Sequence, residues 1–474
     1  MNRLVAIILL LSTFSFIKAQ SINYDVQMGK EAHKEIINTI GIYQHPSETY
    51  IKKLGNRLVA TLQKKQFDFS FYIIDMKEPN AMALPGGYIY ISRGILPLIN
   101  SEAELAGVMG HEIIHAYFRH SIKSMKQGIL PAVLQIPGNI IHEVVSPELG
   151  NLINSPIKFT TQIFSSSYSR QHENEADEYG IVVAAKAGYQ PDALIKVLNR
   201  LEKVSRLETN EEAKFSFFDS HPMTKKREQH IKKNASHTKI IAQKPFIPNK
   251  NDFIKQFEGI CIKDNPAHGI FRENVFLHPD MGFVIEFPKG WITANSPQMV
   301  GAVDSTKKAQ LFMGVKNEQK APSAYAQETK ENIDTSKVIF INDKKTKVNG
   351  RDAYIISLKG KDAKEKIIIH MLWLNMNKYT FLFMAAGNST YNEVLKKSIF
   401  SLRPITPDEK NSIKVTVLKI VPAQESETLA ELSKRTHNVL DTDYLSIIND
   451  IDSSAKLKQG QLIKIGIEKT YVNK

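Results

Sequence analysis

The chain has 474 residues, more than one hydrophobic core usually serves, so we expect two to four domains. Apolar residues make up 42% and charged residues 23%, a balance that is typical of a folded, soluble chain and excludes a disordered one. Much of the net charge of +13 lies in residues 224–259. Because no aromatic-basic motif accompanies that charge, we expect a solvated linker or contact with an anionic envelope surface, and no nucleic-acid partner.

The N-terminus predicts export. Arg3 supplies a positive charge, Leu4–Phe16 is almost entirely apolar, and Ala19 is a small residue suited to cleavage. This pattern is typical of a secretory signal peptide over residues 1–19, with an uncleaved anchor as the alternative. We therefore expect a periplasmic or extracellular protein with no transmembrane helix in the mature chain, and association with a membrane stays open. The single cysteine, Cys261, excludes an internal disulfide.

Two helices and two strands are predicted before residue 92. The helices are expected over Met28–Ile42 and Glu48–Lys64, and the strands over Phe67–Ile74 and Asn80–Ile91. Pro85 fits a strand only at an edge or a bulge, so the residues before it form a candidate edge strand. Such an edge can bind an extended peptide through its backbone, although an ordinary edge strand of the core sheet fits the pattern equally well. The candidate substrate-binding residues are Asn80, Ala81, Met82, Ala83 and Leu84.

The stretch SEAELAGVMGHEIIHAYFRH predicts the helix around which the chain is organised. Its first residue, Ser101, forms a capping box with Glu104, and apolar residues recur behind them at helical spacing. His111 and His115 are four residues apart and therefore share one helix face, close enough to bind one ion. This H-E-x-x-H spacing indicates two neutral zinc-binding histidines, with Glu112 taking a proton from a metal-bound water. Capped or solvated histidines are the alternative.

Prolines interrupt the apolar clusters of Lys123–Ser167, so we expect broken amphipathic helices there. These helices would cover the catalytic helix as a lid, lie on a membrane or partner, or pack in the core.

A second helix, predicted over Tyr168–Gly188, offers a third metal ligand. The sequence excludes a further histidine ligand six residues after His115, because Ser121 stands there. Glu173 and Asp177 are four apart on one face, a spacing that suits a ligand carboxylate and an acid that orients a ligand histidine. Glu175 points about 160° away from Asp177 around the helix and is the weaker candidate.

Four motifs in one order, NAMALPGG, GHEIIHAYFRH, SRQHENEAD and SHPMTKKR, resemble the M48 (Ste24/HtpX-like) zinc metallopeptidases, in particular their exported soluble type. The resemblance covers residues 29 to about 233 and implies a mainly helical, gluzincin-type fold with a small edge-strand sheet. It implies that one zinc ion is held by His111, His115 and Glu173, with Glu112 as the base, Asp177 and Arg227 behind the ligands, and the strand 80–84 along the substrate. The helical repeats that follow the protease in some relatives are not visible in the sequence.

His221 precedes Pro222, which restricts its backbone to an extended conformation and fixes the imidazole. A fixed histidine near the metal has two plausible roles. It could donate to the developing oxyanion, or it could act as a fourth zinc ligand that keeps the protease inactive. The resemblance favours the inhibitory ligand, and a surface histidine in a turn is the alternative.

The remainder of the chain predicts two further domains, which make the fold class α+β multidomain. Strands and helices over Asn274–Pro404 indicate an α+β sandwich, in which His278 and His370 are expected to be structural. A strand-helix-helix-strand pattern over Lys414–Ile465 resembles a degenerate LysM module, for which glycan binding or a structural cap is expected. The expected domains are 1–19 signal peptide, 20–260 metallopeptidase, 261–273 linker, 274–405 sandwich and 413–474 LysM-like module.

These features predict an exported zinc endopeptidase that acts on polypeptide substrates, namely misfolded or unassembled envelope proteins. The rival hypothesis is a largely latent protease that serves as an envelope chaperone or scaffold through its C-terminal domains. Envelope proteins and peptidoglycan are the expected partners of those domains.

Overall fold

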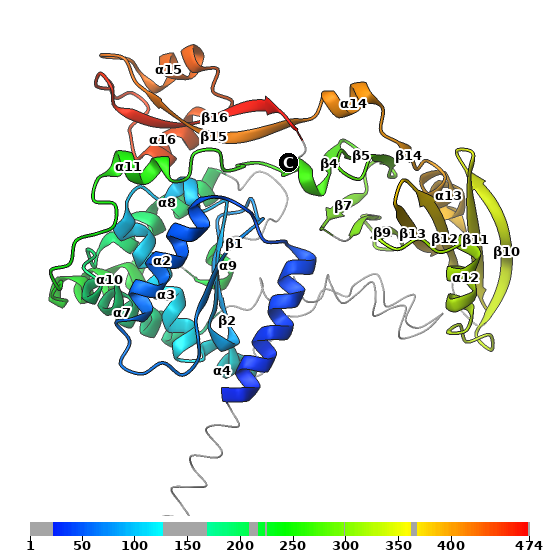
Figure 1. Cartoon of the computed structure of the whole chain (residues 1–474), viewed down its shortest axis with the longest axis horizontal. Coiled ribbons are helices and arrows are strands. Elements are labelled where there is room, and N and C mark those ends of the chain that lie inside the picture. The colour runs from blue at the N-terminus through cyan, green and yellow to red at the C-terminus, as the bar shows by residue number, and fades with distance from the viewer. Residues whose placement is uncertain are drawn as a thin grey trace, which may run out of the picture. The chain divides into compact units, whose positions relative to one another are not determined.

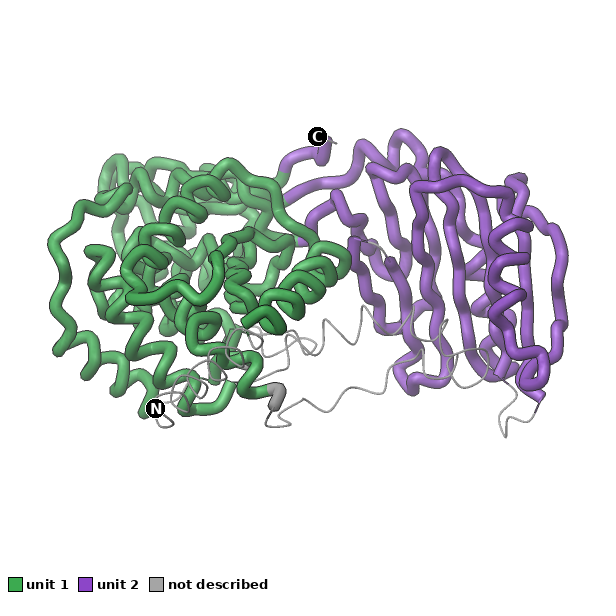
Figure 2. Tube along the Cα trace, turned by 60° about the horizontal axis from the view of Figure 1, so that its bottom comes forward, with its two compact units in different colours: residues 1–131, 162–263, 416–468 green, residues 132–161, 264–415, 469–474 purple. Residues whose placement is uncertain are grey.

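The computed structural model describes residues 22–126, 168–207, 217–222, 225–297, 299–361 and 367–472. The expected signal peptide and most of the expected lid, residues 127–167, lie outside these ranges. The described residues form two compact units (Figure 2). Unit 1 contains the described residues up to 263 together with 416–468, and unit 2 contains 264–415 and the last residues of the chain.

The part of unit 1 before residue 264 is mainly helical with one small sheet, as Figure 1 shows for the elements in blue, cyan and green. A helix over residues 22–39 comes first. The elements that follow up to residue 98 are α2 (Ser47–Val59), β1 (Ser70–Ile74), β2 (Ala81–Leu84), η1 (Pro85–Gly87), β3 (Tyr88–Ser92) and η2 (Leu96–Leu98). The later helices are α3 (Glu102–Tyr117), α4 (His120–Lys126), α7 (Arg170–Lys186), α8 (Ala193–Leu207), α9 (Phe217–Ser220), α10 (Lys225–His237) and α11 (Lys250–Lys255).

The sheet has the order β1-β3-β2, with β1 parallel and β2 antiparallel to β3. β2 is therefore an edge strand, at the residues where the proline pattern predicted one. The chain turns after Leu84 through Pro85 and Gly86, and Gly86 has φ 75°, a conformation that glycine adopts without strain. α3 lies in the middle of the unit and buries almost its whole length, from Glu102 to Ala116.

Two glycines let α3 and α7 approach each other closely. A Cβ on Gly110 would lie 2.9 Å from the Gly180 carbonyl oxygen, and a Cβ on Gly180 would lie 2.9 Å from the His111 backbone nitrogen. Both distances are shorter than van der Waals contact, so no larger residue fits at this crossing without separating the helices. The crossing lies next to His111, and it sets the distance between the predicted ligands of α3 and those of α7.

The last elements of unit 1 are β15 (Lys414–Pro422), α15 (Leu429–Thr436), α16 (Thr442–Asn449) and β16 (Leu462–Thr470). Their order is the strand-helix-helix-strand order that the sequence predicts, and β15 pairs with β16. We expected a separate module here, but residues 416–468 share one core with the helices of unit 1. The fully buried Lys464 donates a hydrogen bond to the Pro97 carbonyl, and Asn100 donates to the Ile448 carbonyl at 3.1 Å. This packing against the turn before α3 explains why the segment is part of unit 1.

Unit 2 has two antiparallel sheets, a seven-stranded one of order β10-β11-β12-β13-β9-β8-β7 and a four-stranded one of order β14-β6-β5-β4. Alternate residues of β12 enter two different cores, one beside α12 and one beside α13. Both nitrogens of the buried His370 are hydrogen-bonded, to Ser357 and Asn392, which is consistent with a structural role. The strands are β4 (Ile270–Arg272), β5 (Val275–His278), β6 (Phe283–Glu286), β7 (Ile292–Asn295), β8 (Met299–Val303), β9 (Ala309–Lys316), β10 (Val338–Val348), β11 (Arg351–Gly360), β12 (Ile367–Met376), β13 (Tyr379–Asn388) and β14 (Arg403–Pro404). The helical elements are η3 (Pro266–His268), α12 (Pro322–Lys330), η4 (Ser389–Tyr391), α13 (Asn392–Ile399) and α14 (Pro407–Asn411).

Candidate metal centre

The N-terminus of α3 is fixed by local and distant contacts. The Ser101 hydroxyl accepts a hydrogen bond from the Glu104 backbone N–H at 3.3 Å, which is one half of the predicted capping box. The Glu104 carboxylate accepts from the Asn100 backbone N–H at 2.6 Å in place of the Ser101 N–H. The Glu104 carboxylate in turn binds both terminal nitrogens of the buried Arg200, at 2.7 and 2.9 Å. A helix held in this way presents the following turns, which carry the predicted ligands, in one orientation.

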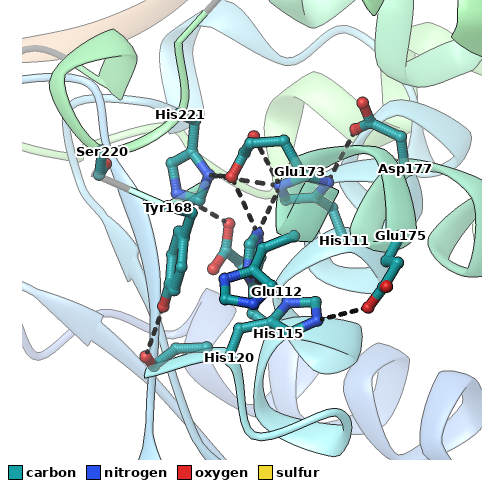
Figure 3. A network of polar contacts seen from close by, with 12 residues as sticks. His111, Glu112, His115, His120, Tyr168, Glu173, Glu175, Asp177, Ser220 and His221 are labelled. Atoms are coloured by element: carbon teal, nitrogen blue, oxygen red, sulfur yellow. Dashed lines mark hydrogen bonds and ion pairs between the residues drawn. The ribbon is translucent and has the colours of Figure 1, made fainter. Parts of the chain in front are cut away.

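Ligand atoms from four buried side chains converge beside α3 (Figure 3). The Nε2 atoms of His111 and His115 lie 3.0 Å apart, and Glu173 Oε1 lies 3.3 Å from His115 Nε2. Nδ1 of His221 lies 3.0 Å from Glu173 Oε1 and 3.3 Å from His111 Nε2. The structure thus brings together all three predicted ligands and the predicted regulatory histidine, from α3, α7 and the residue after α9.

The spacing of these atoms fits a zinc ion. With metal–ligand bonds of about 2.0–2.1 Å in a tetrahedron, ligand atoms lie about 3.3 Å from one another. Several contacts among the four side chains lie near this value, from 3.0 Å between the Nε2 atoms of His111 and His115 to 3.7 Å between Glu173 Oε2 and His111 Nε2, and one ligand atom from each side chain lies within 4.8 Å of all the others. Burial also lowers the pKa of His115 well below its usual range, which keeps the imidazole in the neutral form that binds a metal.

Glu112 is completely buried, and neither of its carboxylate oxygens has a hydrogen-bond partner among the described residues. Burial raises the pKa of this carboxyl group, an effect that the nearby His221 and His111 oppose. The Nε2 atom of His221 lies 3.5 Å from Oε1 of Glu112. A buried carboxylate without a partner is costly, so its place beside the ligands indicates that a water or substrate atom completes its bonding.

Asp177 and Arg227 lie behind the ligands, where they were predicted. Asp177 Oδ1 lies 2.9 Å from His111 Nδ1, so the other ring nitrogen of His111 faces the ligand cluster. Nε and Nη2 of Arg227 donate to the two Asp177 oxygens at 2.7 and 2.9 Å, and its Nη1 lies 2.7 Å from Glu173 Oε2. Burial alone would raise the pKa of Asp177, but the charge and hydrogen bonds of Arg227 act together with His111 to lower it. Burial would also raise the pKa of Glu173, and His221 and Arg227 lower it, so Arg227 helps to keep both of these acids ionised.

The candidate substrate strand lies beside this cluster, but one of its backbone acceptors is engaged. The Ala83 carbonyl of β2 accepts hydrogen bonds from the hydroxyls of Ser121, at 3.2 Å, and Tyr168, at 3.4 Å. Asn80 lies just before β2, and its side chain accepts from the Ala81 backbone N–H, so it caps the strand. Met82 and Leu84 are buried within the strand.

Sequence reasoning missed two residues of the site. The Tyr168 ring stacks on His115 with 3.9 Å between centroids, and a tyrosine at the start of a predicted helix gave no signal of this contact. His120 was read only as the end of the apolar helix pattern. Its Nδ1 lies 3.0 Å from Nδ1 of His115, and its Nε2 lies 3.1 Å from Glu175 Oε2. Burial lowers the pKa of His120 to about 4, so its imidazole is neutral near pH 7.

Unit 1 therefore places a buried acid without a hydrogen-bond partner next to converging metal ligands on two helices. Metallopeptidases of the H-E-x-x-H class cleave peptide bonds with this arrangement. Residues 46–235 match the model of peptidase family M48, so this part of the chain is an M48 peptidase domain, as the four motifs predicted.

Curated relatives match the same region. A beta-barrel assembly-enhancing protease of Yersinia pestis is 31% identical over 190 residues, which are 39% of each chain. The protein of that name from Escherichia coli K12 is 31% identical over 185 residues, 38% of each chain. The mitochondrial metalloendopeptidase OMA1 of Schizosaccharomyces pombe is 26% identical over 219 residues, 44% of this chain and 60% of that one. The alignments thus span about two fifths of the two bacterial relatives.

Within the described residues, no helix combines the length and the apolar character that crossing a membrane requires.

Proposed function

We propose that this protein is an exported zinc-dependent endopeptidase that hydrolyses peptide bonds in misfolded or unassembled envelope proteins. The observation that carries the proposal is the buried Glu112, whose carboxylate has no hydrogen-bond partner among the described residues, beside the ligand cluster. Its substrate class and location are supported by the bacterial relatives, whose name describes proteases that enhance beta-barrel assembly. The export pattern of residues 1–19 is consistent with such a location.

Each residue of the site has its own role in the proposed reaction. His111, His115 and Glu173 would hold the zinc ion, which when bound polarises the attacking water and the scissile carbonyl. Glu112 takes a proton from the water as its oxygen attacks the carbonyl carbon, and it gives that proton to the nitrogen as the C–N bond breaks. The raised pKa of Glu112 suits both steps, because it makes the carboxylate a stronger base than an exposed glutamate. The backbone of β2 would bind the substrate as an added strand.

The described structure corresponds to a restrained state in this proposal. His221 supplies a fourth atom to the ligand cluster and would occupy the position that a catalytic water needs. Phe217 stacks on the His221 ring at 4.5 Å, and Arg227 donates to the His221 carbonyl at 3.1 Å, so the histidine is held from two sides. A substrate strand that uses the Ala83 carbonyl must also displace the hydroxyls of Ser121 and Tyr168.

Two variants test the enzyme and its restraint. Glu112→Gln should retain zinc, measured by elemental analysis, and lose cleavage of an unfolded protein such as casein, because the amide cannot accept the proton. His221→Ala should retain zinc and increase basal cleavage if the histidine is an inhibitory ligand. A loss of about a hundredfold would instead identify an oxyanion donor. Because His221 restrains the wild type in this proposal, the decisive comparison is made in its absence: equal cleavage by His221→Ala and by His221→Ala combined with Glu112→Gln would contradict the enzymatic proposal.

The scaffold hypothesis makes a different prediction in cells. Comparison of envelope proteomes between wild type and Glu112→Gln should show a substrate that accumulates only in the variant. No difference would favour a scaffold. We further propose that the LysM-like segment is a structural part of the peptidase unit rather than a glycan-binding module, since Lys464 and Asn100 join it to the turn before α3. Binding of the full chain to peptidoglycan in a pull-down would argue against this role.

A further inference from the structure

The two histidines of α3 differ in how their second ring nitrogens are held. Nδ1 of His111 faces the carboxylate of Asp177 directly, at 2.9 Å. Nδ1 of His115 faces another imidazole, that of His120, at 3.0 Å. An imidazole can donate or accept at this nitrogen, so the contact alone does not decide which ring carries the proton.

Glu175 resolves this ambiguity. Its Oε2 lies 3.1 Å from His120 Nε2, and an ionised carboxylate can only accept a hydrogen bond, so His120 Nε2 must carry the proton. A neutral imidazole has one N–H, which leaves His120 Nδ1 as an acceptor. His115 must then donate from Nδ1, and its Nε2 keeps the lone pair. Nε2 is the His115 atom that faces His111 and Glu173 in the ligand cluster.

We propose that Glu175 and His120 are positioning residues that fix the metal-binding tautomer and the ring orientation of His115, a role that rests on the zinc-peptidase function proposed above. Figure 3 shows the contact between Glu175 of α7 and His120, the first residue of α4, as a dashed line. Three acidic residues at every second position of α7 then have different roles. Glu173 is a ligand, Asp177 orients one ligand histidine directly, and Glu175 orients the other through His120.

The fold builds this chain of contacts at a break between helices. Arg119 adopts φ 60°, a left-handed conformation that is uncommon for a residue other than glycine, and it separates α3 from α4. In an uninterrupted helix His120 would point about 140° away from His115. The Arg119 side chain is ion-paired with the buried Asp25, with 2.8 Å between Nη2 and Oδ1. This pair holds the turn that returns His120 to His115.

Two neighbouring side chains contact His120 and Glu175. The His172 ring is stacked on His120 with 4.4 Å between centroids and 11° between planes. Gln171, one turn before Glu175 on α7, donates to the other carboxylate oxygen at 3.0 Å. His120 is fully buried, whereas the Glu175 side chain is 31% exposed, so substitution of Glu175 leaves the core intact.

The test measures zinc affinity of the full-length protein by competition with a chromophoric chelator. Loss of an outer-shell partner typically costs 10–100-fold in metal affinity. His120→Leu should therefore bind zinc 10–100-fold more weakly than wild type, because His115 loses its acceptor. His120→Asn should restore most of that affinity, since its Oδ1 can replace the accepting nitrogen. The matched control is His172→Leu, which removes the stacked ring and its 3.4 Å hydrogen bond with Ser124 but leaves the acceptor of His115 intact, and it should change affinity less than threefold.

Glu175→Gln supplies the decisive comparison, because the amide can also donate and no longer fixes the proton on His120. It should weaken zinc binding several-fold in wild type and have no effect in the His120→Asn background, where no imidazole remains to be oriented. In cobalt-loaded protein, the visible absorption bands should change in His120→Leu and not in His172→Leu. Equal losses in His120→Leu and His172→Leu, or an equal effect of Glu175→Gln in both backgrounds, would overturn the proposal.

These readouts separate this inference from the proposed function. If wild type binds zinc and cleaves casein but the His120 variants bind zinc normally, the positioning role is wrong and the protease stands. If wild type binds no zinc, both are wrong.

Discussion

The closest contact between α3 and α7 predicts that a single methyl group will disturb the metal centre. In Gly180→Ala the new Cβ would lie 2.9 Å from the His111 nitrogen, 3.0 Å from its Cα and 3.1 Å from the Gly110 carbonyl carbon. All three are backbone atoms of a buried helix and cannot turn aside. Because ordinary contacts between heavy atoms are about 3.5–4.0 Å, the helices must separate by about 0.5 Å.

This displacement matters more for the metal than for folding. Overpacking a core costs about 1–3 kcal/mol, while alanine in place of a helical glycine returns about 1 kcal/mol. The free energy of unfolding should therefore fall by about 0–2 kcal/mol. Metal–ligand distances tolerate only about 0.2 Å, and α7 carries Glu173 and Asp177 on the displaced side. We expect zinc affinity to fall at least tenfold.

The assay is zinc competition together with thermal denaturation followed by far-UV circular dichroism. Asn174→Ala is the matched control, because Asn174 is exposed on α7 and its replacement improves helix propensity without a new contact. Gly110→Ala should act in the same direction as Gly180→Ala, since its Cβ would meet the Gly180 carbonyl oxygen. Zinc affinity equal to wild type in both glycine variants would refute the role assigned to this crossing.

Two further predictions concern ion pairs. Arg227→Met should lower the free energy of unfolding of the metal-free protein by about 3–5 kcal/mol, because the buried Asp177 keeps its contact with His111 but loses its arginine partner. Adding Asp177→Asn should recover part of that loss in circular dichroism melts. In unit 2, hydrogen bonds from Arg403 lower the pKa of Glu409 from 4.5 to about 2, so this pair stabilises the unit above pH 4.5 and the stabilisation is lost as pH falls through about 2. Both tryptophans of the chain lie in unit 2, so the melting temperature of unit 2 can be followed by their fluorescence as the pH is lowered. Arg403→Leu should make the dependence of this melting temperature on pH shallower. An unchanged dependence would contradict the role given to the pair of Arg403 and Glu409.

The sequence alone predicted the elements of the site that depend on short-range spacing. The cap at Ser101, the single helix face of His111 and His115, and the shared face of Glu173 and Asp177 all follow from the 3.6-residue period of a helix. The proline after Leu84 likewise predicted the edge strand β2. The M48 assignment, made from four short motifs, is confirmed by the family match over residues 46–235.

Only the tertiary structure decided which side chains meet across helices. Glu175 was set aside because it points away from Asp177, yet the left-handed turn at Arg119 brings His120 between Glu175 and His115. The backbone conformation of one residue changed the direction of the next helix, and residue spacing carries no information about such a turn.

In the C-terminal segment, too, local sequence patterns predicted the elements, and contacts between distant residues decided where they pack. Local patterns of apolar residues predicted its strand-helix-helix-strand order. Its place in unit 1 depends on a lysine and an asparagine that donate to backbone carbonyls more than 300 residues away in the chain. Hydrophobic periodicity identifies which face of an element is buried. It does not identify the partner that buries it, because that choice is made by packing among all the elements of the unit at once.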